Sequence, residues 1–292
     1  MEKLKDSQLI VKNGAIYHLN LTPDQIADTI IIVGDPGRVK KISSNFDSIR
    51  FEGQNREILT HTGRIGQNDI TVMSTGMGPD NIDIVLNELD ALANIDLHNK
   101  VAKTEHRKLR IIRLGTSGAV QEDIPVDTYV MSKYGLGIDG LMNFYKDDTG
   151  ILEEEMNNAL IEHANWPKEL AKPYIVKASD KLADAIGFDM HQGITATAPG
   201  FYGPQGRHLR MNLKYPDFIE RLESFTYNDE RILNFEMETS ALYALGRSLG
   251  HETLTICAVI ANRIIEQYST DYHIAVDKLI QILLERIVKV GS

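Results

Sequence analysis

The chain has 292 residues, of which 42% are hydrophobic and 25% are charged, values typical of a globular protein and not of a disordered one. Its 41 acidic residues outnumber its 31 basic residues, and the net charge of -10 argues against nucleic acid or an anionic membrane surface as a partner. The single cysteine, Cys257, excludes an intramolecular disulfide, and its apolar surroundings in the sequence predict a structural thiol in a core strand.

No apolar run reaches the roughly 18 residues that a membrane-spanning helix needs, and we therefore expect a cytoplasmic protein. The usual size of about 150 residues per domain suggests two domains, but single α/β domains often extend to about 250 residues. We expect one domain across residues 1–292, with residues 1–15 as a candidate flexible N-terminus.

The first part of the chain alternates predicted strands with glycine-rich loops and helices. Strands are predicted at residues 30–33, 56–60 and 70–74, and helices at residues 40–46 and 82–92. The segment 94–108 carries mixed charge and little apolar content, and we expect no chemistry there.

Two loops have the composition of an anion site. The first contains Gly34 and Arg38, and the second, at residues 115–118, breaks the apolar run that contains Arg113 and offers the hydroxyl of Thr116. Glycine lets backbone N–H groups approach an oxyanion, and arginine supplies a bidentate fork for phosphate. Either loop alone is also compatible with an ordinary turn and a solvated charge. Two such loops in one chain favour a phosphate site.

The second part of the chain continues the same alternation. Strands are predicted at residues 128–131, 174–176, 193–197 and 254–260, helices at 153–163, 240–248 and 274–290, and loops at 135–140 and 201–207. The last of these loops places Phe201, Gln205 and Arg207 on one irregular segment, where specificity residues tend to lie. A plain proline-glycine surface turn is the alternative interpretation.

Residues 234–239 are predicted to open the helix 240–248, and they bring Glu236 and Glu238 beside an apolar segment. A carboxylate buried there would need a partner, which a polyhydroxyl ligand could supply. Exposure of one or both glutamates is the alternative.

Six short motifs follow one another along the chain in an order that is found in a known protein family. They are His18, Gly34-Asp35-Pro36-Gly37-Arg38-Val39, Arg56-Glu57, Ser74-Thr75-Gly76-Met77-Gly78, Arg113-Leu114-Gly115-Thr116-Ser117-Gly118-Ala119 and Phe235-Glu236-Met237-Glu238. This order resembles that of the nucleoside phosphorylases of the uridine phosphorylase type, over nearly the whole chain.

The resemblance implies a single α/β/α sandwich around a large, mixed, twisted sheet, with phosphate and nucleoside side by side. It implies that phosphate is bound by the set Gly34, Arg38, Arg113 and Thr116, and that Glu238 binds the ribose hydroxyls beside Met237 on the sugar face. It further implies that Arg56 adds a phosphate contact and His18 holds the 5′-hydroxyl in the site of a neighbouring subunit. The functional unit would then be a homo-oligomer, at least a dimer.

Gln205 and Arg207 match the pair with which uridine phosphorylases hold uracil, and Phe201 lies on the same candidate nucleoside-binding loop. A glutamine amide can both donate to and accept from the base, while arginine can donate to its other carbonyl. Purine-specific relatives carry a serine-aspartate pair where this chain has Asn262 and Arg263, so no acid is available for the purine, and Arg263 could support the uracil-binding pair.

The chain also departs from the family pattern. The helix entry Gly78-Pro79-Asp80-Asn81 differs from that of bacterial members, and the segment 94–108 is longer than theirs. These departures argue against carrying over the monovalent-cation site that some members form with the residue matching Glu57.

The sequence therefore predicts a pentosyltransferase that converts uridine and phosphate to uracil and ribose 1-phosphate, with Arg113, Gln205, Arg207 and Glu238 as catalytic residues. We expect no metal and no organic cofactor, because phosphate is a co-substrate. A purine nucleoside phosphorylase or nucleosidase of the same fold is one alternative. A non-catalytic nucleoside-binding protein is the alternative from another class.

Overall fold

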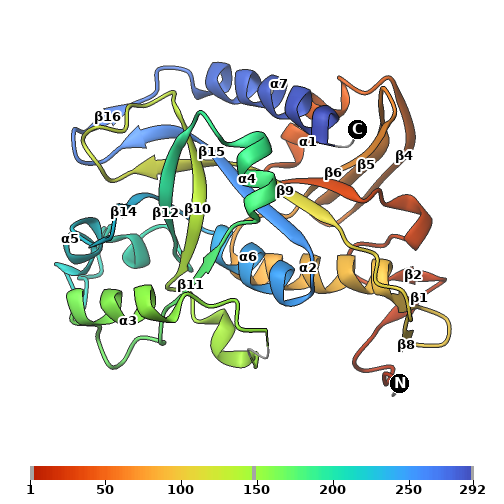
Figure 1. Cartoon of the computed structure of the whole chain (residues 1–292), viewed down its shortest axis with the longest axis horizontal. Helices are drawn as coiled ribbons and strands as arrows, with labels where there is room; N and C mark the ends of the chain where they lie inside the picture. The colour runs from red at the N-terminus through yellow and green to blue at the C-terminus, as the bar shows by residue number, and fades with distance from the viewer. Residues whose placement is uncertain (1–2, 147–148, 291–292) are drawn as a thin grey trace.

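The computed structural model describes residues 3–146 and 149–290, and it shows one large mixed sheet with helices on both sides (Figure 1). Within these residues the sheet has 12 strands, in the order β13-β14-β12-β10-β15-β9-β3-β6-β5-β4, with β11 paired to β10 and β16 to β15. The predicted α/β/α architecture is confirmed.

The elements have the following bounds. The strands of the sheet are β3 (Thr29–Val33), β4 (Ser48–Asn55), β5 (Ile58–Ile65), β6 (Asn68–Ser74), β9 (Arg110–Ala119), β10 (Tyr129–Gly137), β11 (Tyr174–Lys177), β12 (His191–Thr197), β13 (Thr226–Tyr227), β14 (Glu230–Glu236), β15 (Glu252–Asn262) and β16 (Gln267–Tyr268). The helices are α1 (Pro36–Ser43), α2 (Pro79–Asn94), α3 (Glu154–His163), α4 (Asp180–Ile186), α5 (Phe218–Glu223), α6 (Thr239–Ser248) and α7 (Tyr272–Val290), with short 3-10 turns η1 (Pro23–Gln25), η2 (Leu141–Phe144) and η3 (Gly203–Gln205). Two small hairpins pair β1 (Val11–Lys12) with β2 (Ala15–Ile16) and β7 (Ile95–Asp96) with β8 (Val101–Ala102).

Strand β9 pairs with three different strands. It runs parallel to β3 and β15, and its last residues pair with β14, where Phe235 lies opposite Gly118. This last pairing closes β9, β15, β10, β12 and β14 into a ring. The end of β14 is thereby held against β9, although the two strands are far apart in the sequence.

The predicted loop at residues 115–118 is wrong, because β9 continues without interruption to Ala119. Arg113 consequently lies inside the strand and not at its end. Gly115, two residues on, faces the same side of the sheet as Arg113, and a Cβ there would lie 2.2 Å from Arg113 Nη1. The glycine therefore makes room for the arginine side chain and does not break the strand.

Two further predictions are wrong, the first of them again because of glycines inside a strand. The predicted loop 135–140 begins inside β10, where a Cβ on Gly135 would lie 3.1 Å from the backbone of Ser240 and one on Gly137 would lie 2.3 Å from the ring of Tyr174. These glycines permit close packing within a strand. The predicted helix opening at 234–239 is mostly strand, since β14 ends at Glu236 and α6 begins at Thr239.

The segment 94–108 and the N-terminal residues pack on each other. The segment begins at the end of α2 and contains the β7–β8 hairpin. Lys100 Nζ donates to Leu9 O at 2.8 Å, and the backbone N–H of Leu4 donates to Lys100 O at 2.8 Å. Leu9 itself is buried, so the described part of the stretch 1–15 contributes to the core.

Cys257 lies in the middle of β15, opposite Gly115 of β9, and is fully buried, as expected of a structural thiol. Burial raises the pKa of this thiol to about 11. Burial of the neutral thiol therefore stabilises the fold fully below the ordinary pKa of 9.0, and this stabilisation is lost as the pH rises toward 11.

We predict that Cys257 does not react with an aromatic disulfide reagent in the native protein at pH 8, because only about one thiol in a thousand is then the reactive thiolate. The urea-unfolded chain should release about one equivalent of the reporter thiol. A Cys257→Ala variant provides the blank. Rapid reaction of the native protein would show that the strand is open to solvent.

Candidate active site

Arg113 lies between two glutamates in the interior. Its Nη1 is 3.1 Å from Glu236 Oε2, its Nη2 donates to Glu238 Oε2, and its Nη1 also contacts Cys257 Sγ at 3.3 Å. The side chains of Arg113, Glu236 and Glu238 are 7%, 1% and 5% exposed, so the three charges are almost completely removed from water. Buried charges of this kind persist only when they are paired and hydrogen-bonded.

The backbone around the glutamates explains their position. Glu236 ends β14 and accepts hydrogen bonds from the backbone N–H groups of Glu238 and Thr239, at 2.9 and 3.0 Å, and from Thr197 Oγ1 at 2.6 Å. These N–H groups belong to the first turn of α6, where a carboxylate is favoured by the helix dipole. Glu238 accepts from the backbone N–H of Gly78 at 2.7 Å, which ties the loop before α2 to the cluster.

The pKa shifts in the cluster are consistent with an anion bound between Arg38 and Arg113. Burial alone would lower the pKa of Arg113, but the carboxylates of Glu238 and Glu236 raise it well above its usual value. Burial raises the pKa of Glu238, and the charge of Glu236 adds to this effect. The pKa of Arg38 is lowered by burial and by the positive charge of Arg113. An anion between the two arginines would relieve their mutual repulsion.

The structure brings the predicted phosphate residues of one chain together at β9. Arg38 lies in the first turn of α1, whose N-terminus is capped by Asp35, and its Nη1 donates to Leu114 O at 3.3 Å. Thr116 is partly buried two residues further along β9. Gly34 lies where a Cβ would be 3.3 Å from Gly76 O, so the two glycine loops approach each other closely.

A cavity of about 410 Å³ lies at the ends of β9, β14 and β15, and Phe235, the residue before Glu236, is part of its lining. Gly118, Phe235, Gln205, Arg207, Asn262 and Arg263 are among the residues that line it. Gln205 is 3% exposed, and it is held by Arg207 Nη1, which donates to its Oε1 at 2.7 Å, and by Arg263 Nη2, which donates to its backbone O at 2.8 Å. The predicted base-recognition residues therefore form one hydrogen-bonded group.

Two other candidates lie at the edge of this group. The ring of Phe201 is half exposed and lies 4.0 Å from the guanidinium carbon of Arg207, as in a cation–π contact. Met237 lies between the two glutamates and is only partly buried, unlike Glu236 and Glu238.

His18 and Arg56 lie in two segments that contact each other through Asn55. Arg56 is exposed and lies in the two-residue turn between β4 and β5, with a φ of 50°, and not in a strand as the sequence predicted. The neighbouring Asn55 donates from Nδ2 to His18 O at 2.7 Å, which holds the two segments together. A positive φ in a non-glycine residue is uncommon and is often found at functional positions.

Sequence reasoning did not identify the supporting residues. The sequence indicates a carboxylate at Glu236, but the helix predicted to open at residues 234–239 gives no sign that Glu236 caps α6 from the end of a strand. The contact between Cys257 and Arg113 depends on the register that places Cys257 opposite Gly115. The period-two pattern of a strand indicates which residues share a face, but it does not give the register against a strand that is distant in the sequence.

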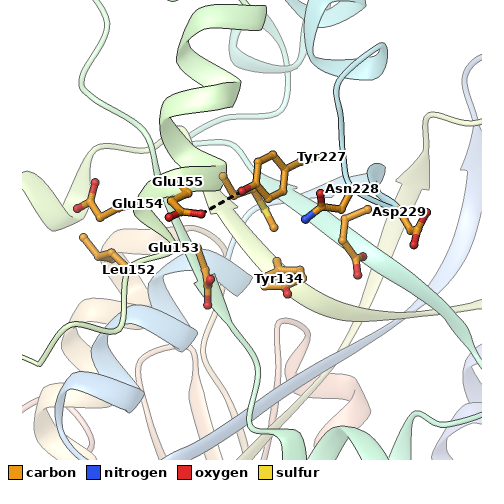
Figure 2. A pocket seen from close by; sticks show the side chains of 10 residues that line it. Tyr134, Leu152, Glu153, Glu154, Glu155, Tyr227, Asn228 and Asp229 are labelled. Atoms are coloured by element: carbon orange, nitrogen blue, oxygen red, sulfur yellow. Dashed lines mark hydrogen bonds between the residues drawn. The ribbon is translucent and has the colours of Figure 1, made fainter.

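Another cavity, of about 400 Å³, is lined by Glu153, Glu154, Glu155, Asp229 and Glu230 together with Tyr134 and Tyr227 (Figure 2). Tyr227 donates to Glu155 at 3.4 Å. Its acidic lining would repel phosphate, and it contains none of the predicted site residues.

Across residues 3–146 and 149–290, no group of three or more His, Cys, Asp or Glu side chains is arranged to hold a metal ion. In the described part of the chain, no helix combines the length and apolarity needed to cross a membrane.

The chain is similar to known phosphorylases over most of its length. A family model described as the phosphorylase superfamily matches residues 28–289. The uridine phosphorylase of Thermococcus kodakarensis is 31% identical over 259 residues, which cover 88% of this chain and 81% of that protein. A DeoD-type purine nucleoside phosphorylase of Streptococcus suis is 26% identical, over 83% of this chain and 84% of that protein.

A solved structure shows the same similarity. The crystal structure of a Trypanosoma brucei nucleoside phosphorylase that shows uridine phosphorylase activity has a TM-score of 0.85 and 32% identity, over 96% of this chain and 99% of that one. The fold, the two glycine loops that approach each other and the glutamates at the end of β14 thus occur in a chain whose sequence matches the family model nearly from end to end. This chain belongs to the phosphorylase superfamily.

Proposed function

We propose that the chain is a uridine phosphorylase, a pentosyltransferase that converts uridine and inorganic phosphate to uracil and ribose 1-phosphate. The observation that carries the proposal is the group formed by Gln205, Arg207 and Arg263 at a cavity whose lining includes Phe235, the residue before Glu236. The names of the relatives from Thermococcus kodakarensis and Trypanosoma brucei support the same activity.

Phosphate is bound in this proposal by Arg38 and Arg113, with Thr116 and the backbone near Gly34 as further donors. A doubly charged anion needs several charge-assisted hydrogen bonds. Burial lowers the pKa of Arg38, and the charge of Arg113 lowers it further, which supports this site because an anion would stabilise both guanidinium groups. Arg113 would then be shared between phosphate and its two glutamates.

Ribose is bound by Glu238, whose carboxylate can accept hydrogen bonds from sugar hydroxyls, with Met237 against the sugar face. The side chain is buried and already accepts from Gly78, so it is held in a defined position before the sugar arrives. The raised pKa of Glu238 indicates that its charge is not fully compensated in the free protein, and additional hydroxyl donors would stabilise it.

Uracil is read by the side-chain amide of Gln205 and by Arg207. Because Arg207 Nη1 donates to Gln205 Oε1, the amide orientation is fixed, and its N–H donors are available to the base. Asn262 is engaged elsewhere, since its Nδ2 donates to the backbone oxygens of Gln121 and Ile124, at 2.8 and 2.9 Å. An amide is also no acid, so Asn262 supplies no proton for a purine ring.

The reaction follows from this charge distribution. A phosphate oxygen forms a bond to C1′ while the bond from C1′ to N1 of uracil breaks, and the electron pair of the broken bond leaves with the ring. The arginines position the phosphate, and Gln205 and Arg207 stabilise the departing uracil anion through its carbonyl groups. In this proposal phosphate is the co-substrate, and no organic cofactor takes part.

The proposal extends to assembly and location. His18 and Arg56 would complete the site of a neighbouring subunit, so the enzyme would be a homo-oligomer, at least a dimer. The hydrogen bond from Asn55 to His18 O, which holds the segments of the two residues together, supports this arrangement. We place the enzyme in the cytoplasm, as expected from its composition.

The proposed activity predicts strict dependence on both base and phosphate. Wild-type protein should release uracil from uridine only when phosphate is present, and its kcat/KM for inosine should be lower by a factor on the order of ten thousand, because the hydrogen-bonding groups of the base site would be unpaired. An absorbance assay of both nucleosides, with and without phosphate, measures this. Efficient cleavage of inosine would instead favour a purine enzyme, and no cleavage of either would favour a binding protein.

Gln205→Ala tests the base site within the same assay. It should lower kcat/KM for uridine by about a hundredfold, as expected for the loss of a donor to developing charge, while the KM for phosphate changes little. Gln281→Ala, which removes an exposed amide on α7, is the matched control. Equal effects of the two substitutions would contradict the assignment of Gln205.

Shared sites predict complementation between inactive variants. Arg56→Ala and Arg38→Ala should each be inactive, but a mixed dimer contains one site with both arginines. Random association should restore about a quarter of wild-type activity, since about half of the dimers are mixed and each has one intact site. Arg38 is chosen because the loss of Arg113 would leave two buried carboxylates unpaired. Verified mixed dimers without activity would contradict a shared site.

A further inference from the structure

His18 is held by a single carboxylate through three contacts. Glu88 on α2 accepts from the backbone N–H of His18 at 3.0 Å and from that of Leu19 at 2.8 Å. The same carboxylate lies 2.6 Å from Nδ1 of the His18 ring. The side chain of His18 therefore has an orientation that is fixed by a residue 70 positions away in the sequence.

Glu88 does not have the surroundings of an ordinary surface charge on a helix. Its side chain is 13% exposed, whereas that of His18 is 30% exposed. The adjacent residues Leu86 and Leu89 are completely buried, so this part of α2 is fixed against the core. The carboxylate is thus presented to the histidine by a rigid element.

The remaining contacts of the turn restrict the same side chain. Asn55 donates from Nδ2 to His18 O at 2.7 Å, and the ring of Tyr17 packs edge-on against the imidazole with a centroid separation of 4.8 Å. Asn55 and Tyr17 accordingly restrict this segment in addition to the two backbone hydrogen bonds that Glu88 accepts. The contact to Nδ1 comes from Glu88.

The chemistry of this contact determines which ring nitrogen can accept a hydrogen bond. An ionised carboxylate is only an acceptor, so the proton between the two groups lies on Nδ1. A neutral imidazole protonated at Nδ1 presents Nε2 as an acceptor. A ligand hydroxyl that binds through its own O–H needs such an acceptor.

We propose that Glu88 is a positioning residue that fixes the tautomer and orientation of His18, so that Nε2 accepts a hydrogen bond from the 5′-hydroxyl of the nucleoside. The inference rests on the proposed function, because it takes His18 as the group that holds this hydroxyl in the site of the neighbouring subunit. Glu88 itself does not touch the substrate. It selects nucleosides with a free 5′-hydroxyl by acting through His18.

A comparison of uridine with 5′-deoxyuridine isolates this role. Wild-type enzyme should prefer uridine by about tenfold in kcat/KM, as expected for one hydrogen bond that involves a polarised group. Glu88→Gln keeps the size of the side chain but leaves one acceptor oxygen for three N–H donors. It should lose most of this preference, and its kcat/KM for 5′-deoxyuridine should stay within about twofold of wild type.

Two controls distinguish positioning from a structural effect. His18→Ala should lose the same preference, and combining it with Glu88→Gln should cause no further loss, because both act on one contact. Asn87→Ala, an exposed neighbour on α2, should keep the wild-type preference. The inference is overturned if Glu88→Gln keeps the preference, if it slows both nucleosides equally, or if wild type does not distinguish them.

A second measurement does not depend on activity. In the ¹⁵N-labelled protein, the ring-nitrogen signals of His18, assigned by their absence in His18→Ala, should report a proton on Nδ1 and an unprotonated Nε2. In Glu88→Gln this preference should disappear. If wild-type protein cleaves no uridine, the proposed function fails while this spectrum still decides the tautomer. A proton on Nε2 in wild type would overturn the inference whatever the activity.

Discussion

The ion cluster of Arg113, Glu236 and Glu238 is the interaction on which the rest of the site depends. Three almost fully buried charges are tolerable only if each is paired, and removing one partner of such a group typically costs about 3–5 kcal/mol. The need to pair them accounts for several features of the fold. Gly115 leaves space for the guanidinium, the pairing of β14 with β9 brings the glutamates to it, and Glu236 also caps α6.

The cluster also connects the two proposed substrate sites. Arg113 is the partner of Glu238, so a phosphate that binds Arg113 and a ribose that binds Glu238 would each replace part of the existing ion pair. The hydroxyl donors of the sugar would stabilise Glu238 when Arg113 turns toward phosphate, and phosphate would stabilise Arg113 when Glu238 turns toward the sugar. Binding of the two substrates would then be mutually favourable, with reciprocal effects on their affinities.

The sequence was sufficient for the strand at residues 30–33 and for the α/β/α class, because apolar runs bounded by glycine have few other interpretations. The helix that follows was predicted at residues 40–46, whereas α1 spans Pro36–Ser43, because Pro36 at its first position starts the helix directly after the glycine loop. Sequence reasoning misassigned Gly115 and Gly135, since a glycine that makes room for a neighbouring side chain looks the same in sequence as one that ends a strand. The partners of Arg113 could not be read from local patterns, because Glu238 is 125 residues away and the contact depends on the closure of the ring of strands. The pairing of Glu88 with His18 was missed for the same reason.

In the proposed mechanism Arg113, although already paired with two glutamates, is a phosphate ligand. Calorimetric titration of inorganic phosphate into wild-type protein and into Arg113→Lys tests it directly, because lysine keeps the buried charge but loses the planar fork of donors. Arg64→Lys, an exposed arginine paired with Asp69, is the matched control. The account predicts saturable binding by wild type and by the control, and affinity weaker by about tenfold or more in Arg113→Lys. Equal affinity in all three proteins would contradict it.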